Sequence, residues 1–370
     1  MCANLASLDL GGNKLASLED DIFSNLSSLT ELDLSKNILT ELPMSVRFLS
    51  KLVRLNLRQN RLTSIPSGLG SCASLAELYL GYNALETVPP EIAELQKLGS
   101  LELRANQLQD LPVELCNLQL SLLDLSDNSV GSLPSELGFM TTLRKLVLDG
   151  NPLRGVRSSL ILGPTTQLLR HLRGRLPNSE AAGSQVLVSS GNVFGEEVQD
   201  SIAKSVTKAS STGVIELQGQ SLTKVPPQAW EENNVVSLDL SKNAISALPP
   251  ELERCTSLKI LSLADNKLSE WPTSLWSSLI SLQQLFMARN PINEFPQDAF
   301  SSLGKLKELD LTGVAAPLPA SPSLSLMPSL ERLHLRQTKL REIPSEICQL
   351  RQLRFLDLSE NSIIAVPEVS

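Results

Sequence analysis

Side chains that could carry covalent or metal chemistry are few in this chain and widely separated. Its 370 residues include two histidines, His171 and His334, and five cysteines, and no Cys/His group has the spacing of a zinc site. The sequence contains no G-x-x-x-x-G-K-[ST] loop, no H-E-x-x-H pair and no G-x-S-x-G turn. We therefore predict a protein that is not an enzyme and that uses no cofactor or metal.

Side chains suited to binding another protein are more concentrated. Both tyrosines of the chain, Tyr79 and Tyr82, lie within four residues of each other. Tyrosine and arginine are enriched at interface hot spots because they bury a large area and keep a polar end. The alternative is ordinary surface variation. The predicted partner-binding residues are Arg54, Arg58, Tyr79, Tyr82, Glu102 and Arg104, with a second group formed by Phe286, Arg332, His334 and Arg336.

A leucine repeat must position these residues. The pattern L-x-x-L-x-L-x-x-N-x-L recurs every 22 to 24 residues in fourteen units, seven on each side of a central break. Eleven units carry Asn at the ninth position. The ninth positions are Asn13, Asn37, Asn60, Asn83, Asn106, Asn128 and Asn151, then Gln220, Asn243, Asn266, Asn290, Val314, Thr338 and Asn361.

Each unit encodes a short strand followed by a turn. The second and third leucines are two residues apart and share the buried face of a strand, so stacked units form a parallel sheet. The ninth-position Asn is expected to satisfy backbone groups that the turn leaves unpaired. A proline follows six residues later in eleven units, and apolar residues spaced three apart after it predict one or two helical turns.

This repeat resembles the leucine-rich repeat superfamily over nearly the whole chain. The L-P-x-x-[IL]-x-x-L second half is similar to the intracellular class related to Ras-binding scaffold proteins. The resemblance implies an α/β solenoid with a parallel sheet on its concave face and short helical or 3-10 turns on its convex face. By family analogy it also implies a protein partner such as a small GTPase or a phosphatase, and a role in signal transduction.

The break in the repeat suggests four segments. We predict a first array at residues 1–153, a basic amphipathic capping helix at 154–177, a partly disordered linker at 178–211 and a second array at 212–370. The arginines of the helix are either solvated or a patch for an acidic partner. A second short helix is predicted over 194–209. Repeats begin and end without a polar cap, so we expect a piece of a longer protein or a shortened gene model.

Composition and charge limit where the protein could act and which partners it could bind. The net charge of −8 and pI of about 5.1 disfavour nucleic acid, and no apolar run reaches the length of a membrane span. Cys72 and Cys116 lie two repeats apart, too far for a disulfide. One glycosylation sequon, at Asn25, is the only feature that argues against an intracellular protein. We predict a cytoplasmic protein, present also in the nucleus, without nucleic-acid or membrane binding, and monomeric.

The concave face carries an acidic column. The fifth position of each unit is Asp or Glu in eight of fourteen units. Either a basic partner uses these acids, or they keep an exposed sheet soluble. Two functions remain: a protein-interaction scaffold that binds through the concave face, and a substrate-recognition adaptor or assembly factor that binds several clients.

Overall fold

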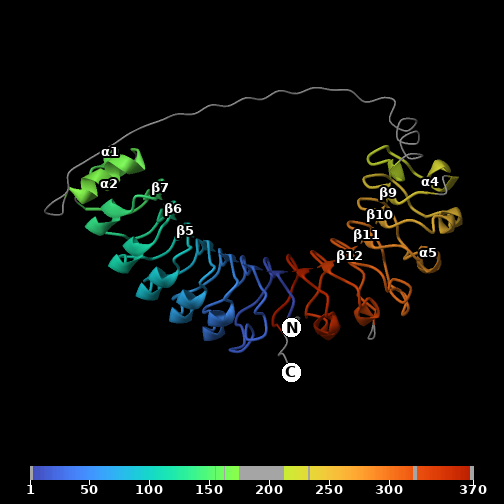
Figure 1. The fold of residues 1–370 in the computed structure, drawn as a ribbon, viewed down its shortest axis with the longest axis horizontal. Helices are drawn as coiled ribbons and strands as arrows, with labels where there is room; N and C mark the ends of the chain where they lie inside the picture. Colours follow the sequence, from blue (N-terminus) through green and yellow to red (C-terminus); the bar gives the residue numbers. More distant parts are fainter. Residues whose placement is uncertain are drawn as a thin grey trace.

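The protein is a curved solenoid with its strands on the inner side of the arc and its helical turns on the outer side (Figure 1). The computed structural model describes residues 3–154, 156–161, 163–174, 212–231, 234–319 and 323–366. The linker predicted at 178–211 and the helix predicted over 194–209 lie outside these residues. The solenoid predicted from the repeat is confirmed.

Within the described residues, fourteen parallel strands of three residues each form one sheet. Each strand covers the third, fourth and fifth positions of a unit, where a buried leucine or isoleucine lies between two residues that face the concave side. The strands are β1 (Ser7–Asp9), β2 (Glu31–Asp33), β3 (Arg54–Asn56), β4 (Glu77–Tyr79), β5 (Ser100–Glu102), β6 (Leu122–Asp124), β7 (Lys145–Val147), β8 (Val214–Glu216), β9 (Ser237–Asp239), β10 (Ile260–Ser262), β11 (Gln284–Phe286), β12 (Glu308–Asp310), β13 (Arg332–His334) and β14 (Phe355–Asp357).

The convex side carries short helices, most of them 3-10. Proline precedes the first helical residue in most of these turns, with extended backbone angles, so its missing N–H removes no helical hydrogen bond. The 3-10 helices are η1 (Met44–Phe48), η2 (Ser67–Ser71), η3 (Pro90–Glu94), η4 (Val113–Asn117), η5 (Ser135–Phe139), η6 (Pro250–Arg254), η7 (Leu324–Leu326) and η8 (Ser345–Gln349); the α-helices are α1 (Ser158–Ile161), α2 (Thr165–Arg173), α4 (Gln228–Glu231) and α5 (Thr273–Ser278).

A single, mostly aliphatic core runs through the described units, with aromatic side chains such as Trp276 and Phe300 in the second array. The repeat leucines are almost completely buried, as with Leu55, Leu78 and Leu101 on neighbouring strands. The ninth-position asparagines connect consecutive units: the Asn37 amide donates to the carbonyls of Leu10 and Leu34, and its oxygen accepts the Leu15 N–H. The structural role predicted for these asparagines is confirmed, since each satisfies buried backbone groups of two units.

The order of the strands differs from the order of the chain. The sheet runs β7-β6-β5-β4-β3-β2-β1-β14-β13-β12-β11-β10-β9-β8, so β1 lies beside β14. The two register pairs at the ends of this contact are Ser7 with Phe355 and Asp9 with Asp357. The blue and red ends of the chain accordingly meet in the middle of the arc (Figure 1). Units 8–14 therefore precede units 1–7 along the solenoid, an arrangement that the repeat spacing does not predict.

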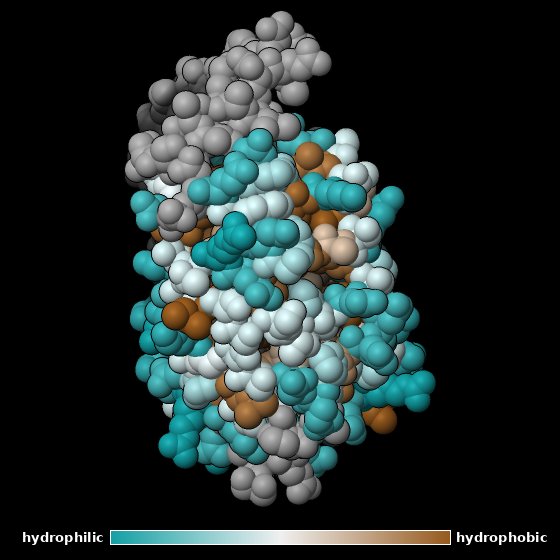
Figure 2. All heavy atoms as spheres, turned by 90° about the vertical axis from the view of Figure 1, so that its right-hand side faces the viewer, coloured by the Kyte–Doolittle hydropathy of each residue, from teal (hydrophilic) through white to brown (hydrophobic). Residues whose placement is uncertain are grey.

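The two outer ends of the sheet differ. Helix α2, predicted from its leucine spacing, packs its buried Leu168, Leu169 and Leu172 at the β7 end. The Thr165 hydroxyl accepts the Leu146 N–H on the open edge of β7, at 3.1 Å. At the β8 end, hydrophilic side chains predominate and hydrophobic ones occur in small groups (Figure 2). Among the described residues, no helix has both the length and the apolarity of a membrane span.

Candidate functional site on the concave face

Alternation along each strand decides which side chains line the concave face. On β4, Leu78 is fully buried, whereas Glu77 and Tyr79 on either side of it are partly exposed. Parallel pairing without a register shift then stacks equivalent positions: Arg54 lies beside Glu77, and Tyr79 lies between Asn56 and Glu102. The concave surface is therefore a set of columns in which neighbours come from units about 23 residues apart.

Five side chains on or next to β3, β4 and β5 form one connected network, which we call the tyrosine cluster: Arg54, Arg58, Glu77, Tyr79 and Glu102. The Arg58 guanidinium lies over the Tyr79 ring, 4.1 Å from its centre. Beyond the ring it makes a bidentate ion pair with Glu102, in which Nε donates to Oε1 at 2.8 Å. The Tyr79 hydroxyl donates to Glu77 at 2.7 Å, and Arg54 Nε donates to the same carboxylate at 2.8 Å.

These contacts fix the protonation state of the cluster. The hydrogen bond from Tyr79, followed by that from Arg54, holds the pKa of Glu77 below its usual value. Burial, followed by the bond to Glu77, raises the pKa of Tyr79. Glu77 is thus an anion and Tyr79 a neutral donor at neutral pH. Because each flexible arginine is paired, the cluster presents a rigid aromatic ring held between two ion pairs.

The remaining residues of the first predicted group lie beside this network. Tyr82 is exposed and has φ of 59°, in the left-handed region where the turn after each strand begins. The Arg104 guanidinium lies 5.6 Å from the centre of its ring and pairs with Asp127 at 3.0 Å. The structure therefore brings all six predicted residues into two adjoining groups on or next to β3, β4 and β5.

The second predicted group is divided. Arg332 and His334 of β13 contact Glu308 on β12, at 3.0 and 3.3 Å. Their aromatic neighbour is Phe355 on β14: its ring centre is 4.6 Å from the Arg332 guanidinium carbon and 4.8 Å from the His334 ring centre. Phe286 lies on β11, two strands from β13. Arg336 is 3.9 Å from Glu360. Phe355 thus takes the place predicted for Phe286.

The acidic column has a local structural role. Asp9, Asp33 and Asp357 each accept the backbone N–H two residues further on, at 2.8 to 2.9 Å. Asn56 occupies the same position in unit 3 and accepts the Arg58 N–H in the same way, so a neutral acceptor can take the place of the carboxylate. In the units with Asp or Asn at this position, the side chain therefore supports the turn that follows the strand, a role that neither of the two predicted explanations includes.

Three of these acids stack directly, and we call Asp357, Asp9 and Asp33 the acidic ladder. They are register partners on β14, β1 and β2. Burial, with the two neighbouring carboxylates adding to it, raises the pKa of Asp9 from 3.8 to about 6, although the Gly11 N–H and Arg336 favour its anion. The ladder thus holds like charges at the spacing at which the tyrosine cluster holds opposite ones.

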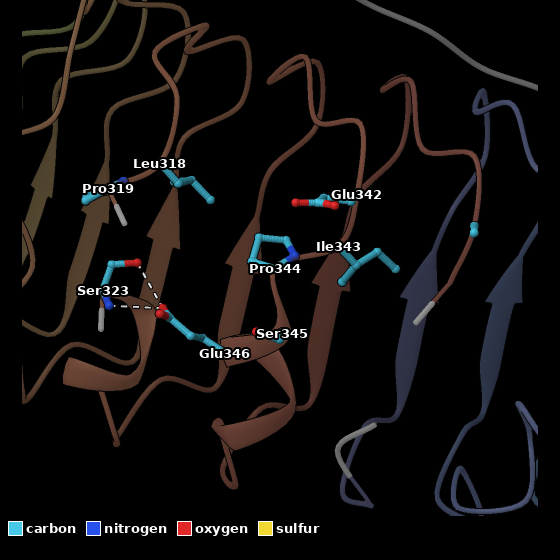
Figure 3. A pocket seen from close by; sticks show the side chains of 9 residues that line it. Leu318, Pro319, Ser323, Glu342, Ile343, Pro344, Ser345 and Glu346 are labelled. Carbon is cyan, nitrogen blue, oxygen red and sulfur yellow. Dashed lines mark hydrogen bonds between the residues drawn. The ribbon is translucent and has the colours of Figure 1, made fainter. Parts of the chain in front are cut away.

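Other polar features are structural. Arg173 of α2 donates through Nε to the Gly138 carbonyl at 2.9 Å and lies over Phe139, so this arginine attaches the helix to η5. A cleft of about 550 Å³ lies beside Pro344, and at its edge the buried Glu346 accepts hydrogen bonds from the N–H and hydroxyl of Ser323 (Figure 3). No group of three or more His, Cys, Asp or Glu side chains among the described residues is arranged to hold a metal ion.

Sequence reasoning missed four contributors to these groups: Glu77, Asp127, Glu308 and Phe355. The repeat alignment could have identified two of them, because equivalent positions of neighbouring units lie side by side: Glu77 beside Arg54 and Phe355 beside Arg332. Asp127 occupies the eighth position, one unit after Arg104 at the seventh, and is found only by following the turn as well as the strand.

The comparisons with known proteins agree with this fold. A leucine rich repeat family model matches residues 3–62, 50–108, 73–130 and 256–313, which together cover half of the chain. The protein belongs to the leucine-rich repeat family.

Solved structures that match it include a leucine-rich repeat protein of Leptospira interrogans, with 28% identity over 99% of this chain and 75% of the other, at a TM-score of 0.39. Another is the ectodomain of an Arabidopsis thaliana receptor kinase crystallised with Casparian strip integrity factor 2, with 25% identity over 95% and 35%, at 0.38. A third is a plant peptide hormone receptor in complex with RGF2, with 26% identity over 97% and 63%, at 0.37. The chain spans about a third of the second protein and under two thirds of the third.

Proposed function

We propose that the protein is a non-enzymatic interaction scaffold that binds a protein partner through its concave face, with the tyrosine cluster as the centre of the contact. The observation that carries this proposal is the Arg58–Tyr79 stack held between Glu102 and Glu77. Its side chains are ordered before any partner arrives, so binding loses less side-chain entropy there than on a surface of free arginines.

The cluster offers both components of an interface hot spot. The Tyr79 ring and the stem of Arg58 supply apolar area, while the partly exposed Arg54 and Arg104 supply donors at its rim. Because Arg58 is neutralised by Glu102, charge steering has a small part and the contact depends on shape and on desolvation of the ring. We expect a partner that inserts an apolar side chain beside Tyr79 and accepts hydrogen bonds from Arg54 or Arg104.

The finer assignments extend this proposal by resemblance. The repeat class suggests a small GTPase or phosphatase as partner and a role in intracellular signalling. The order of array, basic helix and second array resembles leucine-rich repeat-containing protein 40. A cytoplasmic location is supported by the side chains of Cys72 and Cys255, which are buried and free. Burial raises the pKa of the Cys72 thiol to about 12, which makes it unreactive at neutral pH.

The test is affinity purification of the tagged full chain followed by mass spectrometry. We expect a stoichiometric partner whose recovery falls roughly 30-fold or more in a Tyr79→Ala, Arg104→Ala variant, the size of effect that a hot spot gives. Arg289→Ala is the matched control, because Arg289 also pairs with an eighth-position aspartate, Asp265, but lies far from the cluster.

Circular dichroism establishes that each variant keeps its fold. Unchanged recovery in the double variant would overturn the proposed centre. A broad set of clients in place of one stoichiometric partner would favour the adaptor.

A further inference from the structure

The contact between β14 and β1 reproduces an ordinary step between repeats. Within the first array, the Asn37 oxygen accepts the N–H two residues after the preceding unit's asparagine, and its amide donates to that unit's Leu10 carbonyl. At the β14–β1 contact, the Asn13 oxygen accepts the Ile363 N–H at 3.0 Å and its amide donates to the Leu358 carbonyl at 3.1 Å. Unit 1 therefore docks on unit 14 as if it were the next repeat. We call this contact the joint.

The joint differs from every other step in one respect, which is connectivity. At every other step of the sheet a short segment of chain links the two stacked units, but Asn13 and Ile363 are 350 residues apart. The covalent connection between the two halves leaves α2 at the β7 end of the sheet and re-enters at β8, the opposite end. The joint can therefore open without any strand having to thread through a loop.

Opening the joint would expose an extensive apolar surface. Leu8 and Leu10 of unit 1, and Leu356, Leu358 and Ile363 of unit 14, are at most 2% exposed. A solenoid end without a polar cap is unstable in water, because each repeat buries its face only against a neighbour. A surface that fits each opened face in pairing and hydrogen bonding is its counterpart, on the same chain or on another copy.

Chain length allows both solutions. Residues 175–211 are 37 residues long, with a contour of at most roughly 130 Å. Thirteen steps of about 4.8 Å between neighbouring strands cover roughly 60 Å along the sheet. The connection is therefore long enough to join the two ends of one arc, and it does not restrict units 8–14 to the units 1–7 of their own chain.

We propose that the joint is exchangeable, so that units 8–14 of one chain dock on units 1–7 of a second copy through the β14–β1 pairing. A contact between two different surfaces of the same chain closes within one molecule at low concentration and links copies at high concentration. The partner of this surface is thus a second copy of the protein, independent of any partner bound at the tyrosine cluster.

The test uses two versions of the full chain, one isotopically heavy with an affinity tag at its N-terminus and one light without a tag. Both carry a protease site inserted between Ser190 and Gly191. The versions are mixed at high concentration, cut at the inserted site before any dilution, then diluted and captured on the tag, and mass spectrometry counts heavy and light fragments containing units 8–14. We expect both kinds in the captured fraction, approaching equal shares with longer mixing.

Two results would overturn the proposal. A captured fraction with only heavy second-array fragments would show a joint that does not exchange. A captured fraction without any second-array fragment would show that the halves do not hold together once the chain is cut.

A matched pair of variants separates the joint from general stability. Asn13→Ala removes the side-chain bonds across the joint, and Asn60→Ala removes the equivalent bonds between units 2 and 3. We expect Asn13→Ala to lower retention of the second-array fragment after cutting roughly ten- to a hundredfold, from buried groups left unpaired. Asn60→Ala should leave retention unchanged. Equal losses in both variants would contradict a role specific to the joint.

Discussion

The tyrosine cluster and the acidic ladder lie on one sheet of uniform register and differ in the charge of their neighbours: the cluster draws its arginines from the third and seventh positions, and the ladder stacks acids at the fifth. In the cluster, Arg54 faces Glu77 across adjacent strands and Arg58 reaches Glu102 across two. In the ladder, Asp357, Asp9 and Asp33 stack directly, and the opposite charge that acts on Asp9 is Arg336, from outside the column. The backbone geometry is the same in both, so side-chain sequence alone makes one region a rigid ion-paired surface and the other a stack of repelling carboxylates.

The comparison also separates the residues that stabilise the fold from the concave charges, which contribute little to it. Both regions lie above equivalent asparagines and leucines, with the buried Asn37 beneath the ladder and the half-buried Asn83 beneath the cluster. The concave charges change the free energy of unfolding by small amounts. Asp9 stabilises the fold in its protonated form at low pH, and Glu77 does so as an anion at neutral pH. The buried amides should matter more, because removing one leaves several backbone groups without partners.

The largest effect is therefore expected beneath the surface. Asn37→Ala leaves the Leu15 N–H and the Leu10 and Leu34 carbonyls without their side-chain partner and should lower the free energy of unfolding by about 2–5 kcal/mol. Denaturant unfolding followed by circular dichroism measures it. The control is Asn25→Ala at an exposed asparagine, expected to stay within about 0.5 kcal/mol of the parent. If Asn37→Ala lowered the free energy of unfolding as little as the control does, the asparagine side-chain bonds would not be a main source of stability.

The next effect belongs to the ladder and depends on pH. The folded-state pKa of Asp9 is raised to about 6 from 3.8, so its protonated form stabilises the fold below about pH 4 and that stability is lost as pH rises through 6. Asp9→Asn keeps the acceptor for the Gly11 N–H and should be more stable than the parent by about 1–2 kcal/mol above pH 6, and equal to it below pH 4. Unfolding curves across this range, with exposed Asp20→Asn as control, measure the difference. A constant difference at every pH would contradict the raised pKa.

The smallest effect belongs to the cluster and has the opposite sign. The pKa of Glu77 is lowered by Tyr79 and Arg54, so its contribution is present at neutral pH and disappears as pH falls through the lowered value. Glu77→Gln should cost about 0.2–1 kcal/mol at pH 7, because both ion-pair partners are partly exposed, and nothing in strong acid. Exposed Glu86→Gln is the control in the same unfolding assay. A larger loss in acid than at pH 7 would contradict the assignment.

The sequence predicts the repeated parts of the molecule because spacing alone determines them. The leucine spacing predicts a strand that ends at Tyr79 and buries Leu78. The ninth position of the repeat predicts that the Asn37 side chain bonds to the backbone, as it does between units 1 and 2. The candidate site was found only in part, because the contacts of Arg58 with Tyr79 and of Tyr79 with Glu77 depend on side-chain reach across the columns.

The joint could not be predicted from spacing. The pairing of Leu8 with Leu356 joins two units that every repeat pattern treats as the far ends of the chain. All fourteen units present similar edges, so local sequence does not say which units stack on which. The place of a unit in the solenoid therefore depends on pairing between units far apart in sequence, such as β1 with β14.

The most direct test of the central claim compares the two concave regions in partner binding. With the captured partner in hand, its dissociation constant is measured by calorimetry for the parent, for Tyr79→Ala with Arg58→Ala, and for Asp9→Asn with Asp33→Asn. The cluster variant should bind roughly 30-fold or more weakly, and the ladder variant should bind like the parent. Loss of binding in the ladder variant with full affinity in the cluster variant would place the partner on the acids and contradict the account.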